Sequence, residues 1–375
     1  MSNSGFEVEQ VDMLGARASR DKGLGTEFPQ RAEINTDLNY YDRAKRIDTK
    51  INFHNPSSIL YEIKKTLYEK DIDHLVRRGN YLASMKSKLQ RNANRRQNCV
   101  KMLAFSFNEN TKVTDALNER LILASEGFEV SSIYDSYDLT PSELKQRIKI
   151  SIGFMAEHGI TPKRINIRIP KMLQRPDILR EKMAISFADA DGVALKYTSI
   201  GRSPRQHRVI RQFNATGGWT HMYDVPNMWS GNSRTSTMHM EQLFGIDSFS
   251  LRVRKPLKNP PPLTPKRLDI GTLGNLTIQE HTQRYGTELL CPCDICMNRT
   301  MTDMENDYSP FERYTMFRSH LPYAANIEYA LDRDAIENGG KHLLNRLRNK
   351  EFMAQPFKAI YNKDINSRNF QPRLF

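Results

Sequence analysis

Short apolar runs alternate with helical segments through the middle of this sequence, and this alternation constrains the fold more than any other feature. The apolar runs predict strands at 100–107, 128–135, 165–170, 191–200, 219–226 and 246–253. The segments between them predict helices at 114–127, 140–159, 175–187, 204–218 and 235–245. Strands and helices that alternate through short connections are typical of a parallel α/β fold.

The length of the alternating region indicates which parallel fold to expect. The span from about residue 50 to 255 suits a (β/α)8 TIM-type barrel. A doubly wound open sheet is the alternative. No G-x-G-x-x-G loop follows a predicted strand, which weighs against a dinucleotide-binding version of that sheet.

Three of the four cysteines lie together in CPCDIC, where Cys291, Cys293 and Cys296 form a C-x-C-x-x-C motif. A tetrahedral metal site needs a fourth ligand, and the nearest downstream histidine is His320, in a segment with a helical pattern. Free thiols are the alternative, but an exposed thiol trio is prone to oxidation. We therefore predict one structural Zn²⁺ ion bound by these four residues.

The zinc motif completes the predicted domain organisation. Residues 1–45 are polar and predict an N-terminal extension, and residues 46–270 predict the barrel. A proline-rich connector at 256–265 leads to a zinc-binding subdomain with C-terminal helices over 271–375. No apolar run is long enough for a transmembrane helix, and the N-terminus does not resemble a secretory signal. With so few cysteines, we expect a soluble, cytoplasmic protein that does not bind membranes.

The chain is basic, with 56 Lys and Arg against 43 Asp and Glu and a net charge of +13. Two stretches, 85–98 and 251–267, contain cations and no acidic residue, a composition that fits phosphate contacts. A solvated surface is the alternative. The predicted nucleic-acid-binding residues are Lys86, Lys88, Arg95, Arg96, Arg252, Arg254 and Lys255.

A (β/α)8 pattern followed by C-x-C-x-x-C and a histidine about two dozen residues later resembles the tRNA-guanine transglycosylase superfamily. This superfamily includes relatives that place 7-deazaguanines in DNA. The resemblance covers about residues 75–340. Besides the zinc motif it rests on RRGNYLASM (77–85), SSIYDSYDLTP (131–141), ADGVALKYTSIGR (190–202) and MHMEQLFGIDSFSLRV (238–253).

The resemblance implies base exchange by covalent catalysis, in which a carboxylate attacks the anomeric carbon as the old base leaves. The family's nucleophile falls at Ser250 of this sequence, and its second acid falls at Arg77. Asp247 keeps the first Asp of the family's last-strand motif. Serine without an adjacent base is a poor nucleophile, so the chemistry of this chain should differ from that of the family.

A base pocket at the carboxyl ends of the strands is still expected. Asp135 matches the family's base-binding Asp, and Asp224 ends another predicted strand. The candidate catalytic residues are Asp135, Asp224 and Asp247, and the candidate base-binding residues are Tyr134, Tyr197 and Arg168, with Tyr137 and Trp229 as further aromatic residues that could stack on a base. Helix capping for the acids and core packing for the aromatic residues are the alternatives.

Three functions follow from these features. The first is cleavage of an N-glycosidic bond by a DNA glycosylase that excises a modified or foreign base, for instance in viral DNA as an antiviral defence. The second is a transglycosylase that exchanges guanine for a 7-deazaguanine in DNA or tRNA, with Asp247 or another Asp as nucleophile. The third is a non-catalytic nucleic-acid-binding subunit. About 50 residues follow the zinc region without an evident RNA-binding appendage, which favours DNA over tRNA. A homodimer remains an open alternative to a monomer.

Overall fold

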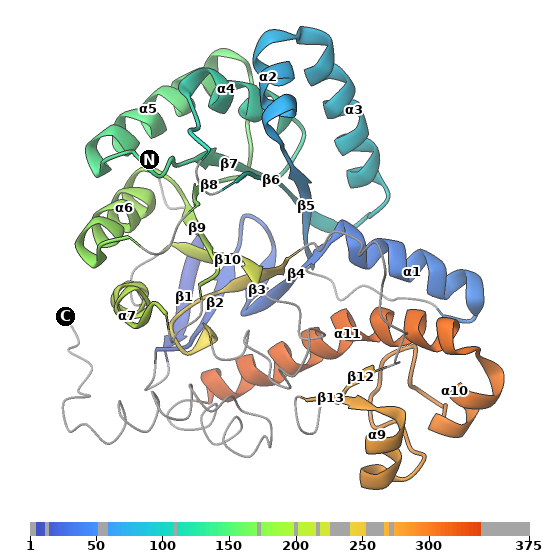
Figure 1. Cartoon of the computed structure of the whole chain (residues 1–375). Coiled ribbons are helices and arrows are strands. Elements are labelled where there is room, and N and C mark those ends of the chain that lie inside the picture. The colour runs from blue at the N-terminus through green and yellow to red at the C-terminus, as the bar shows by residue number, and fades with distance from the viewer. Residues whose placement is uncertain are drawn as a thin grey trace, which may run out of the picture.

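Eight parallel strands form a closed barrel in the computed structural model of this protein (Figure 1). The structure describes residues 5–11, 15–51, 59–108, 111–170, 174–198, 202–214, 218–225, 241–252, 266–269 and 274–338. The barrel strands, each paired with the next, are β4 (Gln30–Ile34), β5 (Ile59–Thr66), β6 (Cys99–Ser106), β7 (Val130–Tyr134), β8 (Arg164–Ile169), β9 (Gly192–Lys196), β10 (Trp219–Val225) and β11 (Ser248–Leu251). The predicted (β/α)8 barrel is confirmed.

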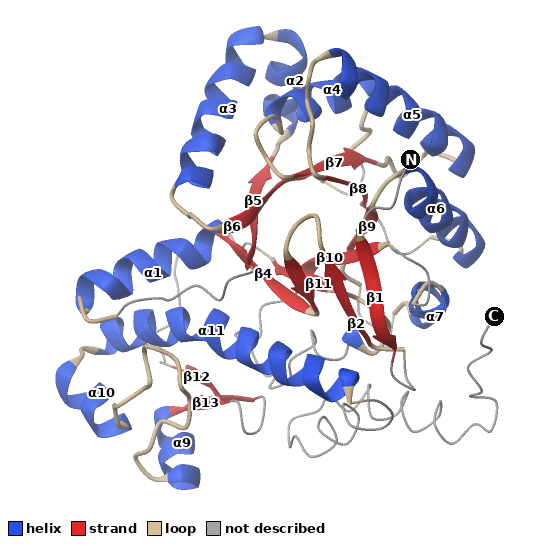
Figure 2. Ribbon diagram, turned by 180° about the vertical axis from the view of Figure 1, so that it is seen from behind, coloured by secondary structure: helices blue, strands red, loops and turns tan. Residues whose placement is uncertain are grey.

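Helices surround the barrel on the outside (Figure 2). They are α1 (Asn35–Ile47), α2 (Glu69–Arg77), α3 (Gly79–Asn94), α4 (Asp115–Ala124), α5 (Pro141–Glu157), α6 (Pro176–Asp189) and α7 (Pro204–Gln212). Local sequence explains where several of them begin. Thr114 caps α4, and Thr140 forms a capping box with Glu143 ahead of Pro141 in α5.

The barrel begins earlier than the sequence predicts. The predicted boundary between an extension over 1–45 and a barrel over 46–270 is wrong, because β4 and α1 lie within the first 47 residues. The strand is short and lacks an apolar run. Its charged residues face the helices, where Arg31 pairs with Asp37 and Glu33 pairs with Arg96. Because these charged residues are buried in ion pairs, the sequence of β4 is polar although the strand is buried.

A three-stranded antiparallel sheet covers the N-terminal end of the barrel. It consists of β1 (Phe6–Val11), β2 (Arg17–Asp21) and β3 (Thr26–Phe28). Phe28 stacks on Trp219 at the start of β10, and Asp21 pairs with Arg164 at the start of β8 at 2.7 Å. The sheet therefore closes the end of the barrel at which the strands begin.

The eighth outer position of the barrel is occupied by α11 (Pro310–Glu337), which packs against α1 and β4. Tyr329 of α11 stacks on Phe249 of β11, with ring centroids 6.0 Å apart. The predicted subdomain over 271–375 therefore needs correction, since α11 completes the barrel. The segment inserted before it contains β12 (Lys266–Asp269), β13 (Gly274–Thr277), α9 (Ile278–Tyr285) and α10 (Met301–Asp307), beside the barrel in Figure 1.

The length and polarity of the helices decide whether any of them could span a membrane. Within the described ranges, every helix is too short or too polar to cross a bilayer. The long helix α11, for example, contains charged residues along its whole length.

Candidate active site and metal centre

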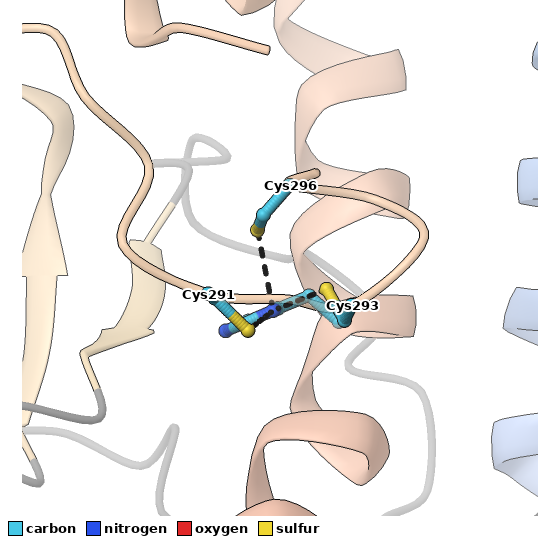
Figure 3. A group of neighbouring side chains, drawn as sticks. Cys291, Cys293 and Cys296 are labelled. Carbon is cyan, nitrogen blue, oxygen red and sulfur yellow. Dashed lines mark hydrogen bonds between the residues drawn. The ribbon is translucent and has the colours of Figure 1, made fainter. Parts of the chain in front are cut away.

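The four predicted metal ligands converge on one buried point. Cys291, Cys293 and Cys296 come from the loop after α9 (Figure 3), and His320 comes from the middle of α11. The Nδ1 atom of His320 lies 3.7, 3.1 and 3.5 Å from the Sγ atoms of the three cysteines in chain order. Ligands around a tetrahedral zinc ion are spaced by about 3.5 Å, given metal bonds of about 2.0–2.3 Å. The cluster could therefore hold a metal ion.

Two residues of β12 orient this cluster. The Nε2 atom of His320 lies 2.9 Å from the carbonyl oxygen of Leu268, which leaves Nδ1 as the ligand atom. The Nε atom of Arg267 donates to Sγ of Cys296 at 3.4 Å, and the guanidinium offsets thiolate charge. All four ligands are buried, and three sulfurs with one nitrogen fill a tetrahedral shell. The arrangement suits a structural metal and leaves no position for a substrate.

A separate pocket lies at the carboxyl ends of the barrel strands, where active sites of this fold are found. Its cavity volume is about 20 Å³, within about 340 Å³ of non-atom space that includes open solvent. Five neighbouring strands, β6 to β10, or the residues directly after them supply its walls. The lining residues are Phe105, Ser106, Phe107, Tyr134, Asp135, Arg168, Pro170, Lys196, Tyr223 and Asp224. Two of the three predicted catalytic acids are thus in one pocket.

Asp135 follows β7 directly and is almost completely buried. Its Oδ2 atom accepts a hydrogen bond from Nζ of Lys182 on α6 at 2.7 Å. Its Oδ1 atom is buried and has no hydrogen-bond partner among the described residues. Burial raises the pKa of Asp135 to about 6, against the opposing effect of Lys182. Near neutral pH the group therefore exchanges between acid and carboxylate and keeps one oxygen available.

Asp224 lies in β10 with a left-handed backbone, at φ 58°. A non-glycine residue rarely adopts this conformation unless its surroundings require it, and such residues concentrate at functional sites. Its Oδ1 atom accepts a hydrogen bond from Nζ of Lys64 at 2.9 Å. Burial alone would raise the pKa of Asp224, but Lys64 and Arg168 outweigh burial and lower it. Asp224 therefore stays ionised at neutral pH.

Charged side chains also fill the barrel directly beneath the pocket. Glu62 of β5 accepts a hydrogen bond from Nη2 of Arg168 at 3.1 Å and lies 3.5 Å from Nε2 of His221. Burial opposes ionisation of Glu62, but Lys64 and Arg168 lower its pKa below the usual range. Burial also lowers the pKa of His221. The buried carboxylate of Glu62 therefore holds Arg168, a cation of the pocket wall, in place.

Aromatic side chains form part of the pocket wall. The guanidinium of Arg168 lies 3.7 Å from the ring centroid of Tyr223, close enough for a cation–π contact. The hydroxyl of Tyr134 accepts a hydrogen bond from the backbone nitrogen of Phe105, and its ring meets Phe107 edge to face. Arg168 and Tyr134, two of the predicted base-binding residues, therefore line the pocket.

The other predicted aromatic residues are less central. Tyr197 follows β9, is half-buried and packs against the apolar core outside the pocket lining. Tyr137 is 52% exposed and also lies outside that lining. Trp229 lies outside the described residues.

The third predicted catalytic acid, Asp247, lies at the opposite end of the barrel. It precedes β11, is fully buried, and pairs with Arg17 of β2. Ser19 and the backbone nitrogen of Thr220 also donate to it, at 2.9 and 2.7 Å. The prediction of a catalytic Asp247 is therefore wrong, because Asp247 lies at the end of the barrel away from the pocket. Its contacts there fasten the N-terminal sheet to the barrel.

The two positions at which the family's acids are replaced also differ from the expected arrangement. Ser250 lies inside the barrel beneath the pocket, 3.3 Å from Nε2 of His221. Arg77 ends α2 on the outer surface, with 76% of its side chain exposed and an ion pair to Asp73. Arg77 is therefore remote from the barrel interior, because residues 77–85, which resemble the family segment that carries the second acid, fold as the end of α2 and the start of α3.

The predicted nucleic-acid-binding cations divide into paired and unpaired groups. Lys86 pairs with Glu126, Arg95 pairs with Asp42, and Arg96 is buried against Glu33. Lys88 is exposed on α3, and none of the described acids lies within ion-pair distance of it. Arg252 is exposed directly after β11, at the pocket end of the barrel. Arg254 and Lys255 lie outside the described residues.

Four titratable residues of this site have no counterpart in the sequence prediction, namely Glu62, Lys64, Lys182 and His221. The alternation of apolar and polar residues within ILYEIKKT and WTHMYDV provides the signal for three of them. Glu62 and Lys64 occupy alternate positions of β5, and His221 and Tyr223 occupy alternate positions of β10. Polar residues at every second position of a barrel strand indicate a polar interior.

Comparisons with known proteins do not assign this chain to a family. No protein-family model matches it, and no curated protein matches it. The functional assignment therefore depends on the geometry of the barrel pocket and of the metal centre.

Proposed function

We propose that this protein cleaves the N-glycosidic bond of a flipped-out nucleotide and acts as a DNA glycosylase on a modified or foreign base. The observation that carries the proposal is a pair of carboxyl groups in one pocket with pKa values shifted in opposite directions. The pKa of Asp135 is raised to about 6, and that of Asp224 is lowered. Opposed shifts of this kind are typical of an acid and a charge-stabilising group that act together.

Each carboxyl group would have a separate role in the reaction. Glycosidic cleavage passes through a sugar with oxocarbenium character, and protonation of the leaving base lowers the barrier. Asp135, in its acid form, would donate a proton or a hydrogen bond to the base through Oδ1, which has no partner among the described residues. Asp224, in its ionised form, would stabilise the positive sugar or orient the attacking water.

The remaining lining suits a base that has left the stack. Tyr134 and Tyr223 present aromatic surface, and Arg168 offers donors to base carbonyl groups. The residue at the family's nucleophile position is Ser250, which is fully buried and lies outside the pocket lining, so its hydroxyl does not face a sugar bound there. Excision by water therefore fits this chain better than covalent base exchange. Because excision of normal bases would be harmful, the target should be a damaged, foreign or hypermodified base, such as one in viral DNA.

The basic surface supports a nucleic-acid partner. Arg252 is exposed at the end of the barrel that contains the pocket, and Lys88 is exposed on α3. Contacts of such cations with phosphates would hold the strand while one nucleotide enters the pocket. DNA remains the favoured polymer, and tRNA is an outcome that the test below distinguishes.

The metal in the cysteine–histidine cluster is proposed to be Zn²⁺. Thiolate and imidazole ligands in a tetrahedral set select zinc over hard cations such as Mg²⁺. Cys291, Cys293 and Cys296 would bind through sulfur and His320 through Nδ1. The ion would supply no chemistry to the reaction, because it would be enclosed and belongs to a cluster distinct from the pocket.

The test is base release from a panel of modified and plain DNA duplexes, single strands and tRNA. Free bases are identified by mass spectrometry, and abasic sites are detected as alkali-labile breaks. We expect release of a modified base from DNA and none from plain DNA. Incorporation of labelled 7-deazaguanine instead would establish exchange. Binding without release or exchange would establish a nucleic-acid-binding subunit.

A further inference from the structure

Lys64 is a buried amine beside the pocket that the proposed cleavage does not use. It lies on β5, and its side chain is 4% exposed. Its ammonium donates to Oδ1 of Asp224 at 2.9 Å and to the carbonyl oxygen of Leu251 at 3.1 Å. An ammonium has three donors, and these are the two that the described residues engage by hydrogen bonds. Leu251 ends β11, so the amine reaches across the pocket end of the barrel.

The position of Lys64 differs from that of the other two lysines of the site. Lys182 comes from α6, outside the strands, and its ammonium contacts Asp135. Lys196 ends β9 on another part of the wall. Lys64 alone among these three is bonded to Asp224, the carboxylate assigned to the sugar. An amine in that position would be adjacent to the anomeric carbon of a nucleotide whose sugar lies beside Asp224.

We propose that Lys64 is the nucleophile of a second activity, a β-lyase that cleaves the strand at the abasic site left by base excision. This proposal rests on the proposed glycosylase function, which supplies the abasic sugar. A lysine amine that condenses with a sugar aldehyde is an established form of covalent catalysis for carbonyl substrates. The substrate class is therefore an abasic deoxyribose within a DNA strand.

The steps balance without an oxidant or a reductant. The Lys64 ammonium gives one proton to water, the amine nitrogen attacks C1′ of the ring-opened abasic aldehyde, and the hydroxyl formed on C1′ takes that proton back as it leaves. Loss of one water gives a protonated imine, which acidifies the hydrogens on C2′. A base removes one of these protons, a C2′–C3′ double bond forms, and the C3′–O bond breaks with release of the 5′-phosphorylated strand. Water then hydrolyses the imine and returns the lysine.

The experiment uses the full-length protein and a DNA oligonucleotide with one preformed abasic site. The preformed site makes the test independent of which base the glycosylase recognises. Sodium borohydride is added to reduce the imine to a stable amine, and the covalent protein–DNA complex is separated on a denaturing gel. We expect a trapped complex with wild-type protein, and strand cleavage without alkali when borohydride is omitted.

The variants identify the nucleophile. Lys64→Gln should reduce trapping at least about a hundredfold, the scale expected for a lost nucleophile. Lys64→Arg keeps a cation beside Asp224, so it should fold and bind DNA like the wild type while trapping no complex. Lys145, exposed on α5, provides the matched control, and Lys145→Gln should trap normally. Loss of trapping in Lys196→Gln together with retained trapping in Lys64→Arg would overturn the assignment.

The outcomes separate this inference from the proposed function. Base release from modified DNA without trapping at a preformed abasic site would overturn the lyase and leave the glycosylase. Trapping through Lys64 without base release from any substrate would support the lyase and overturn the glycosylase. Absence of both activities would overturn both proposals.

Discussion

The two ends of the barrel each contain a buried carboxylate paired with a cation, yet the two sites differ in how completely the carboxylate is bonded. At the N-terminal end, Asp247 accepts hydrogen bonds from Arg17, Ser19 and the backbone of Thr220, beneath a covering sheet. At the carboxyl end, Asp135 pairs with Lys182 through one oxygen, and its other oxygen has no partner among the described residues.

This difference teaches how to distinguish structural acids from functional ones in the same barrel. A buried carboxylate with all its acceptor positions used fastens two parts of a fold and has no capacity left for a ligand. A buried carboxylate with an unused oxygen costs free energy, which a ligand or a proton can recover. We therefore assign Asp247 to the assembly of the fold and Asp135 to recognition or chemistry.

Metal removal should give the largest loss of stability. Its effect should reach the sheet-covered N-terminal end of the barrel through α11. His320 lies on the helix whose Arg333 donates to the backbone of Ser19 and Phe28 in the covering sheet. Structural zinc contributes on the order of 10 kcal/mol in small domains, so Cys296→Ser should sharply lower the melting temperature and the yield of folded protein.

The fourth cysteine provides the matched control for this prediction. Cys99 lies at the start of β6, outside the cluster, so Cys99→Ser should retain about one zinc per chain. Elemental analysis and thermal unfolding check both variants. Full stability of Cys296→Ser without bound metal would contradict a structural metal.

Asp247→Asn should give the next largest effect, and on stability alone. The change leaves the buried guanidinium of Arg17 without its charge partner, which typically costs about 3–5 kcal/mol. Asp73→Asn removes the exposed partner of Arg77 and should change the free energy of unfolding by less than about 0.5 kcal/mol. Denaturant unfolding measures both. Loss of activity per folded molecule in Asp247→Asn would place chemistry at the closed end.

The titration of Asp135 at the pocket end should give a smaller effect, seen in the pH dependence of activity and of stability. Because the pKa of Asp135 is about 6, its acid form decreases about tenfold per pH unit above that value, and kcat/KM should decrease with it. Between the usual pKa of 3.8 and about 6, the folded state holds a proton that the unfolded chain has lost. Stability should therefore fall as pH rises through this window.

Asp135→Asn tests both parts of this pH prediction. The variant should lose the decrease in stability between pH 4 and 6, because the amide does not titrate. Activity profiles and unfolding curves over pH 4–8 measure the two effects. A wild-type rate that rises through pH 6 would show that Asp135 acts as a base.

The salt dependence of nucleic-acid binding should show the smallest effect. Lys88→Gln should reduce the slope of log K against log salt by roughly 1, as for one lost phosphate contact. Lys86 is the matched control on the same helix, because Glu126 already pairs with it. Lys86→Gln should change the slope less than Lys88→Gln. Equal slopes for both variants and wild type would make this face a solvated surface.

Part of this molecule could be predicted from sequence because the relevant signals are local. Strands β6 to β11 are apolar runs, and the metal ligands lie in a short motif plus one histidine, so both were predictable. Strand β4 was missed because its charged residues are paired and buried, Arg31 with Asp37 of α1 and Glu33 with Arg96, which follows α3. Arg96 is distant from Glu33 in the sequence, so no local pattern encodes that pair.

The candidate site was predictable only at the carboxyl ends of predicted strands. Asp135 follows β7 directly, Asp224 is the last residue but one of β10, and both line the pocket. Asp247 was misplaced because it was assigned from the family resemblance, although it stands at the start of the predicted strand 246–253. Lys182 could not be predicted, since its role depends on how α6 packs against β9 and so brings Lys182 to Asp135.

The central claim is that the pocket at the carboxyl end of the barrel cleaves a glycosidic bond while the closed end supports the fold. The most direct test measures abasic-site formation per folded molecule in wild type, Asp224→Asn and Asp247→Asn on DNA that contains the released base. We predict a fall of about a hundredfold or more in Asp224→Asn and an unchanged rate in Asp247→Asn. Equal activity of wild type and Asp224→Asn, or an inactive but folded Asp247→Asn, would contradict the claim.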